Sequence, residues 1–110
     1  MQKFIIMGGN RLSGEITLQG SKNSSLPIMA AALLAEGECV LKSCPLLTDV
    51  YSASRILNCL GCRCRLSSGN AIIDASDVSA FEIPKELMRE MRSSIMFMGA
   101  ILGRMGECII

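Results

Sequence analysis

Residues 20 to 41 read GSKNSSLPIMAAALLAEGECVL, and the rest of the chain is organised around this stretch. A glycine, a lysine and an asparagine stand directly before a run rich in alanine, leucine and methionine. This composition predicts a helix from about Ser24 to Ala35, in which Pro27 is tolerated because first-turn amides have no partner within the helix. The run carries no charge before Glu36. We therefore expect a helix that is buried on all sides, with polar groups only at its N-terminal end.

The segments on either side of this helix predict strands and a second helix. GEITLQG alternates apolar and polar residues, which is typical of a strand from Glu15 to Gln19, and ECVLKS predicts another strand. TDVYSASRILNCLG predicts an amphipathic helix with Thr48 or Asp49 as its N-terminal cap. The inner face of that helix would carry Val50, Ala53, Ile56, Leu57 and Leu60.

After Gly61, CRCRLS and AIIDA predict two further strands, which SSGN joins by a tight turn. The predicted order is therefore strand, helix, strand, helix, strand, strand, over residues 14 to 75. The chain then continues as a loop and becomes helical after Pro84, to about Met105.

The C-terminal segment repeats the opening stretch. Residues 91 to 110, MRSSIMFMGAILGRMGECII, align without gaps to residues 22 to 41 at an offset of 69 and match at eight of twenty positions. An internal repeat of this length indicates that a second βαβαββ unit begins at about residue 83 and continues to residue 110. We therefore expect residues 1 to 110 to be a partial first domain of about one and a half units.

Composition excludes several classes of protein. The net charge of +1 and the lack of any run of five like charges give no footprint for nucleic acid or for an anionic membrane. The longest uncharged apolar runs fall far short of the roughly 18 residues that span a membrane. The apolar stretch in MQKFIIMGGN is too short for a signal peptide, so we expect a cytosolic protein.

Six cysteines in a cytosolic chain predict reduced thiols rather than disulfides. The spacing of Cys59, Cys62 and Cys64 allows a zinc site as an alternative, although the chain has no histidine and no second Cys-x-x-Cys motif. The simpler interpretation places Cys62, Cys64 and Leu66 on the inward face of a strand, where they alternate with two arginines.

The chemistry at the two helix starts points to an anionic ligand. Helix N-termini present free amides and a partial positive charge. Gly20 would permit close approach of the backbone, Lys22 adds a full charge, and Arg92 offers a bidentate fork at the equivalent helix start. Asn23 and Ser24 are also ordinary capping residues, and a lysine near a helix start is often only solvated, so both interpretations stand at this level.

The motifs GSKNSSLPIMAAALLAEGE, LTDV, LGCRC and MRSSI, in this order and spacing, resemble the N-terminal part of the UDP-N-acetylglucosamine 1-carboxyvinyltransferases. These belong to the enolpyruvyl transferase family and begin peptidoglycan precursor synthesis. The resemblance implies an inside-out α/β barrel of repeated βαβαββ units, here incomplete, with helices inside and sheets outside. The N-terminal ends of these helices, called here the helix mouths, would then face the cleft where substrates bind.

The resemblance also implies substrates and roles. Lys22 would contact the anion of phosphoenolpyruvate and stabilise charge on its phosphate, Asn23 would lie beside it and the sugar nucleotide, and Arg92 would serve UDP-N-acetylglucosamine. No metal and no cofactor are required. The family's general acid lies in a loop that would begin after this chain ends, and no cysteine here matches it, so we expect the chain alone to be inactive. The parent would be monomeric, whereas the fragment would expose apolar surface and self-associate.

Two other functions remain open at this stage. The sister family, the shikimate-pathway enolpyruvyl transferases, typically has serine at the position of Asn23. A stand-alone anion-binding module would use the same helix mouths without chemistry.

Overall fold

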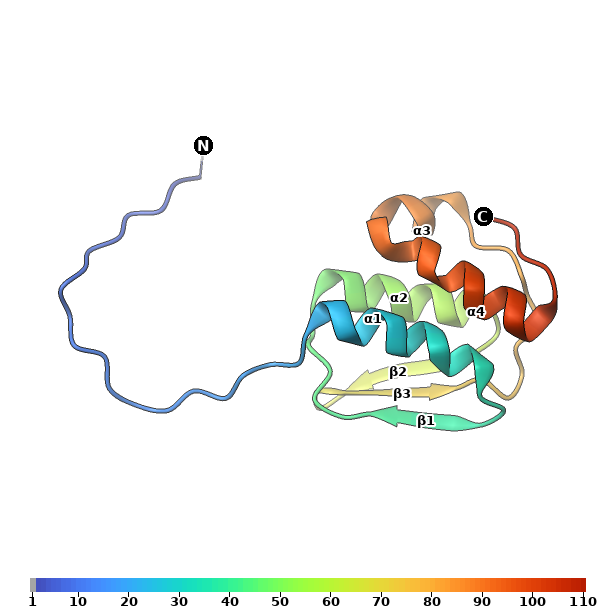
Figure 1. Ribbon diagram of the computed structural model, residues 1–110, viewed down its shortest axis with the longest axis horizontal. Coiled ribbons are helices and arrows are strands. Elements are labelled where there is room, and N and C mark those ends of the chain that lie inside the picture. Colours follow the sequence, from blue (N-terminus) through green and yellow to red (C-terminus); the bar gives the residue numbers. More distant parts are fainter. Residues whose placement is uncertain (1) are drawn as a thin grey trace.

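The structure of the protein, a computed structural model, describes residues 2–110. Figure 1 shows one α/β body, in which α1 and α2 cover one face of a three-stranded sheet and α3 and α4 lie beyond them. The elements in chain order are α1 Lys22–Ala31, the 3-10 helix η1 Ala32–Leu34, β1 Glu38–Leu41, α2 Thr48–Cys59, β2 Arg63–Ser67, β3 Asn70–Asp74, α3 Lys85–Glu90, the 3-10 helix η2 Arg92–Ile95 and α4 Met96–Met105.

The sheet has the strand order β1-β3-β2, and both pairings are antiparallel. Cys39, Ile73 and Cys64 lie opposite one another across the three strands. The predicted turn between β2 and β3 forms with Ser68 and Gly69 at φ 51° and 75°. Two consecutive positive φ angles define the hairpin turn whose twist matches that of the strands, which confirms the prediction for this stretch.

The core lies between the sheet and the helices. The inner face of α2 is as predicted, because all five of its apolar residues are fully buried. Cys62 and Cys64 are buried as the inward face of β2, and Leu66 is partly buried beside them. Gly61 has a φ of 102° directly after α2, a conformation that glycine adopts without strain and that ends the helix.

Helix α1 begins at Lys22, two residues before the predicted start. Leu26, Met29 and Leu33 are buried, but Ile28 is 51% exposed and Leu34 is 54% exposed. The expectation of burial on all sides is therefore wrong for this chain. An α-helix can bury its whole circumference only when elements cover every side, and residues 2–110 cover only part of α1.

The sequence had predicted one continuous helical segment after Pro84. This prediction is wrong, because α3 ends at Glu90, before Met91. Met91 has an extended backbone, with φ −139° and ψ 119°, and its side chain is buried. The Ser94 hydroxyl then donates to the carbonyl of Met88 at 3.2 Å, and the Ser94 amide donates to the carbonyl of Met91. The extended residue lets a long apolar side chain enter the core and lets a new helix start where the repeat predicts one.

The two repeated helices lie side by side and run in the same direction (Figure 1). A Cβ built on Gly103 would lie 3.0 Å from the side chain of Leu34, and the guanidinium of Arg104 donates to the carbonyl of Ala35 at 2.8 Å. Both pairs are separated by 69 residues, which is the offset of the sequence repeat. Equivalent positions of the two copies therefore meet, at the end of η1 in the first copy and at the end of α4 in the second.

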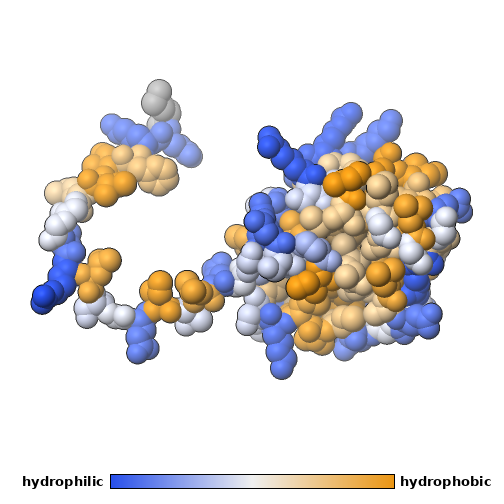
Figure 2. Space-filling model, viewed as in Figure 1, coloured by the Kyte–Doolittle hydropathy of each residue, from blue (hydrophilic) through white to orange (hydrophobic). Residues whose placement is uncertain are grey.

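Residues 2–19, called here the N-terminal arm, form no helix and no strand. The predicted strand from Glu15 to Gln19 is therefore wrong. Figure 1 shows the arm running away from the body, and Figure 2 shows apolar residues along it. Phe4 is 95% exposed, and Ile16 and Leu18 are also exposed. Alternating side chains make a strand only beside a sheet edge, and the arm pairs with none among the residues described.

No helix within residues 2–110 is long and apolar enough to cross a membrane.

Candidate functional site

Lys22 is the first residue of α1, and Asp49 holds its ammonium. The Lys22 Nζ lies 3.0 Å from Oδ2 of Asp49, in the first turn of α2. The side chain of Lys22 is 44% exposed, and that of Asp49 is 27% exposed. Figure 1 shows that α1 and α2 begin at the same end of the body, which brings the two residues together although the sequence separates them widely.

The chain enters α1 in a fixed conformation. Both the amide and the hydroxyl of Ser25 donate to the carbonyl of Ser21, at 2.9 Å and 2.7 Å. Gly20 packs against the loop after β1, where a Cβ would collide with the carbonyl of Ser43 and press on the ring of Pro45. A glycine is needed here because protein backbone approaches it closely, which explains Gly20 without a ligand.

A surface hollow at this mouth is lined by Lys22, Leu47, Thr48 and Asp49. An ammonium group has three donors, and one carboxylate oxygen of Asp49 lies beside that of Lys22. The free amides at the start of α1 and its partial positive charge lie beside the same group. The arrangement can therefore accept an anionic oxygen, such as one from a phosphate or a carboxylate.

Asn23 and Arg92, the other two predicted site residues, are both exposed. Asn23 is the second residue of α1 and not its cap, while Arg92 opens η2. Within residues 2–110 neither side chain makes a hydrogen bond or an ion pair, and Arg92 does not line the hollow of Lys22. The structure thus brings together Lys22 and Asp49, and leaves Asn23 and Arg92 facing solvent.

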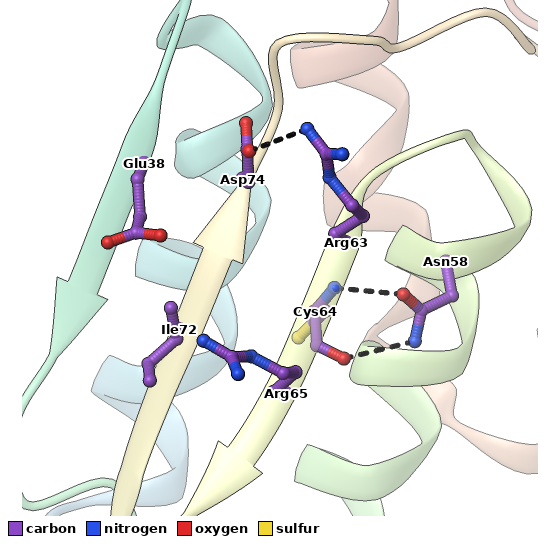
Figure 3. Close-up of a pocket in the computed structure, with 7 residues that line it drawn as sticks. All are labelled: Glu38, Asn58, Arg63, Cys64, Arg65, Ile72 and Asp74. Atoms are coloured by element: carbon purple, nitrogen blue, oxygen red, sulfur yellow. Dashed lines mark hydrogen bonds and ion pairs between the residues drawn. The ribbon is translucent and has the colours of Figure 1, made fainter.

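A larger hollow, of about 440 Å³, lies on the outer face of the sheet (Figure 3). Arg63 pairs with Asp74 at 2.9 Å and with Asp77 at 3.4 Å. Hydrogen bonds from the hydroxyl and the amide of Ser76 hold the pKa of Asp74 below its usual range. Because this arginine already has carboxylate partners, the hollow has the character of a solvated sheet face.

Asn58 also lines this hollow, but both the oxygen and the nitrogen of its amide bond the backbone of β2. Its Oδ1 accepts from the amide of Cys64 at 2.9 Å, and its Nδ2 donates to the carbonyl of Cys64 at 3.3 Å (Figure 3). The two bonds attach the end of α2 to β2, so Asn58 has a structural role.

All six cysteines are free thiols. Burial raises the pKa of Cys62 to about 11 and also raises the pKa of Cys64. Both thiols are therefore protonated at neutral pH and are poor nucleophiles. Within residues 2–110 no three side chains of histidine, cysteine, aspartate or glutamate are close enough to hold a metal ion together.

Sequence reasoning missed two residues that shape this region. Thr48 or Asp49 was expected as the cap of α2, but Leu47 occupies that position and α2 has no side-chain cap. The position of Asp49 in a first helical turn was the available sequence signal, because a carboxylate there can pair with a cation from a neighbouring helix. Arg104 was not singled out from the sequence, because its position against the end of η1 depends on tertiary packing.

Comparisons with known proteins bear on the family and the fold of this chain. The family model described as EPSP synthase (3-phosphoshikimate 1-carboxyvinyltransferase) matches residues 6–109. The chain is 49% identical over 110 residues to UDP-N-acetylglucosamine 1-carboxyvinyltransferase 2 of Caldanaerobacter subterraneus subsp. tengcongensis. It is 44% identical over 109 residues to UDP-N-acetylglucosamine 1-carboxyvinyltransferase 1 of Clostridium acetobutylicum.

These two matches take in 100% and 97% of this chain, but only 26% of each relative. The crystal structure of the enolpyruvyl transferase NikO from Streptomyces tendae superposes with a TM-score of 0.79 at 28% identity, over 90% of this chain and 23% of that one. The fold is therefore an incomplete enolpyruvyl transferase barrel, and the chain belongs to the EPSP synthase family of carboxyvinyltransferases.

Proposed function

We propose that this chain supplies the phosphoenolpyruvate side of an enzyme that transfers the enolpyruvyl group to the 3-hydroxyl of UDP-N-acetylglucosamine. This reaction is the first committed step of peptidoglycan precursor synthesis. The observation that carries the proposal is the ammonium of Lys22 at the mouth of α1, with donors free for an anionic ligand. The chain spans 26% of its relatives, so turnover belongs to a longer protein.

The reaction is an addition followed by an elimination. The sugar oxygen bonds to C2 of phosphoenolpyruvate and loses its proton, while C3 gains a proton. C3 then loses a proton, the C–O bond to phosphate breaks, and the double bond re-forms as inorganic phosphate leaves. Negative charge develops on the phosphate as its C–O bond breaks in the elimination, and a fixed ammonium beside it stabilises that charge.

The other predicted residues take supporting roles in this proposal. Asn23, one residue after Lys22, lies beside the same ligand and reaches towards the sugar nucleotide. Arg92 at the start of η2 contacts UDP-N-acetylglucosamine, which a guanidinium can hold through a bidentate contact with a phosphate. The proton donor for C3 lies outside residues 1–110, and the chain alone is therefore inactive.

The choice of acceptor rests on the names of the relatives. The family model covers the shikimate branch by its description, whereas the two relatives at 44% and 49% identity are named for UDP-N-acetylglucosamine. Asn23 also favours the UDP-N-acetylglucosamine branch, because the shikimate branch typically has serine at this position. UDP-N-acetylglucosamine is therefore the better supported acceptor.

The test is Lys22→Ala in the longer protein, assayed for phosphate release with both substrates. We expect kcat to fall by about 100-fold or more, since removing one preorganised donor to a charged transition state has effects of this size. Lys85→Ala is a matched control, because Lys85 also opens a helix and is exposed. Circular dichroism checks that both variants fold. Turnover at the unsubstituted rate in Lys22→Ala would remove Lys22 from the site.

A further inference from the structure

The carboxylate of Asp49 sits between the first turns of two helices. It belongs to α2, where a negative charge near the N-terminus is favourable, and it faces Lys22 at the start of α1. With 27% of its side chain exposed, Asp49 is the more buried member of the pair. Its position is thus set by α2 and by its neighbours more than by Lys22.

The ammonium of Lys22 is at an unfavourable end of its own helix. A cation in the first turn of a helix meets the partial positive charge of the free amides. Its flexible four-carbon stem also has many rotamers, and their entropy favours an ammonium that moves freely in solvent. The ion pair with Asp49 opposes both effects and keeps the ammonium over the mouth of α1.

We propose that Asp49 is a positioning residue that holds Lys22 ready for the phosphate of phosphoenolpyruvate, an inference that rests on the proposed function. Asp49 attracts the ammonium through one carboxylate oxygen at 3.0 Å, and an ammonium with three donors can still bind the ligand. The ligand then finds the side chain already ordered, and binding loses less entropy. Asp49 itself is an acceptor and makes no contact with the ligand.

This role predicts that removal of the Asp49 carboxylate weakens anion binding, whereas charge repulsion alone predicts that removal strengthens it. Asp49 carries the same charge sign as the ligand, so a carboxylate that merely lay nearby would weaken anion binding, and its removal would strengthen it. A carboxylate that orders Lys22 has the opposite effect when removed. The direction of the change in affinity therefore separates the two roles.

The experiment is a double-mutant cycle on the 110-residue chain, followed by NMR with phosphoenolpyruvate and with inorganic phosphate as probes. The variants are Asp49→Asn, Asp49→Glu, Lys22→Met and the double variant Asp49→Asn with Lys22→Met. Asp77→Asn serves as the control, since Asp77 also pairs with a cation but is 75% exposed. Two readouts are taken, namely the inequivalence of the Lys22 ε-methylene protons without ligand, and the dissociation constant.

We expect Asp49→Asn to remove the inequivalence and to weaken phosphoenolpyruvate binding by about five- to tenfold, the effect of one freed long side chain. Asp49→Glu restores part of both readouts, and Asp77→Asn changes neither. In the Lys22→Met background Asp49→Asn has no further effect, which a general structural role would not produce. Backbone amide spectra confirm that each variant is folded.

The contrary outcomes are distinct. Tighter or unchanged binding in Asp49→Asn, with binding still weakened in Lys22→Met, overturns the role of Asp49 and leaves the proposed function standing. Unchanged ε-methylene signals in Asp49→Asn overturn it without reference to any ligand. Binding to Lys22→Met that is as tight as to the unsubstituted chain, or no binding to the unsubstituted chain, overturns both proposals for this chain.

Discussion

Arg104 joins three segments through one side chain. Its guanidinium donates to the carbonyls of Leu33 at 3.1 Å, Ala35 at 2.8 Å and Ala75 at 2.9 Å. The first two carbonyls close the end of η1, and the third follows β3. A cation here also meets the partial negative charge at a helix C-terminus, so the contact is favourable by charge as well as by geometry.

Arg104→Met should lower the free energy of unfolding by about 2–3 kcal/mol, because it leaves partly buried carbonyls without a charged donor. Urea unfolding followed by circular dichroism measures the loss. Arg55→Met is the matched control, since the 2.8 Å pair of Arg55 with Glu90 is a surface pair with the arginine 61% exposed. Such pairs contribute about 0–1 kcal/mol. Equal losses in the two variants would contradict the role given to Arg104.

The buried thiols predict a fall in stability at alkaline pH. Burial raises the pKa of Cys62 to about 11 from an ordinary value of 9.0. The unfolded chain therefore releases this proton first, and between pH 9 and about 11 the folded state binds more protons than the unfolded state. Below pH 9 the contribution of Cys62 to the free energy of unfolding should not change with pH. Between pH 9 and about 11 the free energy of unfolding should fall as pH rises.

Urea unfolding in a reducing buffer, from pH 7.5 to 10.5, measures this dependence. Cys62→Ala should make the fall shallower without abolishing it, because burial also raises the pKa of Cys44 and Cys64. An identical slope in the variant would show that Cys62 does not titrate in this window.

Residue-level prediction from sequence succeeded where a residue type and its place in an element were sufficient. Lys22 was predicted at the mouth of the first helix, and Cys62 and Cys64 on the inward face of a strand, from local spacing alone. The pairing of Lys22 with Asp49 could not be predicted in the same way, because it depends on how α1 lies beside α2.

At the scale of elements, the turn between β2 and β3 offers a stabilising substitution. Ser68 has a φ of 51°, which serine adopts at some cost, and Gly69 follows it at 75°. Asparagine tolerates the left-handed conformation better, and Asn-Gly is the preferred pair for this turn. Ser68→Asn should raise the free energy of unfolding by about 0.5 kcal/mol, measured by urea unfolding. A loss of stability would argue against this turn geometry.

Elements were predicted well where the sequence pattern and the packing agree. The amphipathic period of α2 and the turn chemistry of the hairpin are local signals, and both are confirmed. The strand from Glu15 to Gln19 failed because a strand needs a partner edge, which alternation alone cannot supply. The break in the helix at Met91 was not predicted, because its cause, the burial of one side chain, depends on tertiary structure.

At the scale of the whole molecule, the exposed apolar residues predict self-association of the isolated chain. They lie in the N-terminal arm, as at Phe4 and Leu18, and on the helices, as at Ile28 and Leu102 (Figure 2). Light scattering should show a mass that rises with concentration. Removal of residues 1–19 should reduce the rise and leave the melting temperature nearly unchanged, because the arm contributes nothing to the core. A constant monomer mass at high concentration would contradict this prediction.

The side-by-side arrangement of α1 and α4 has a consequence for symmetry. Phe97 in α4 is fully buried, whereas Ile28, its equivalent in α1, is 51% exposed. The face that α4 turns towards the body is thus the face that α1 turns to solvent, and the contact is heterologous rather than self-complementary. A heterologous contact cannot be closed by two copies, so units stacked in this way form a ring of at least three or an open stack. In a barrel built from this repeat, every helix would then have two neighbours of its own kind, and the exposed face of α1 that carries Ile28 is where a second such neighbour would pack.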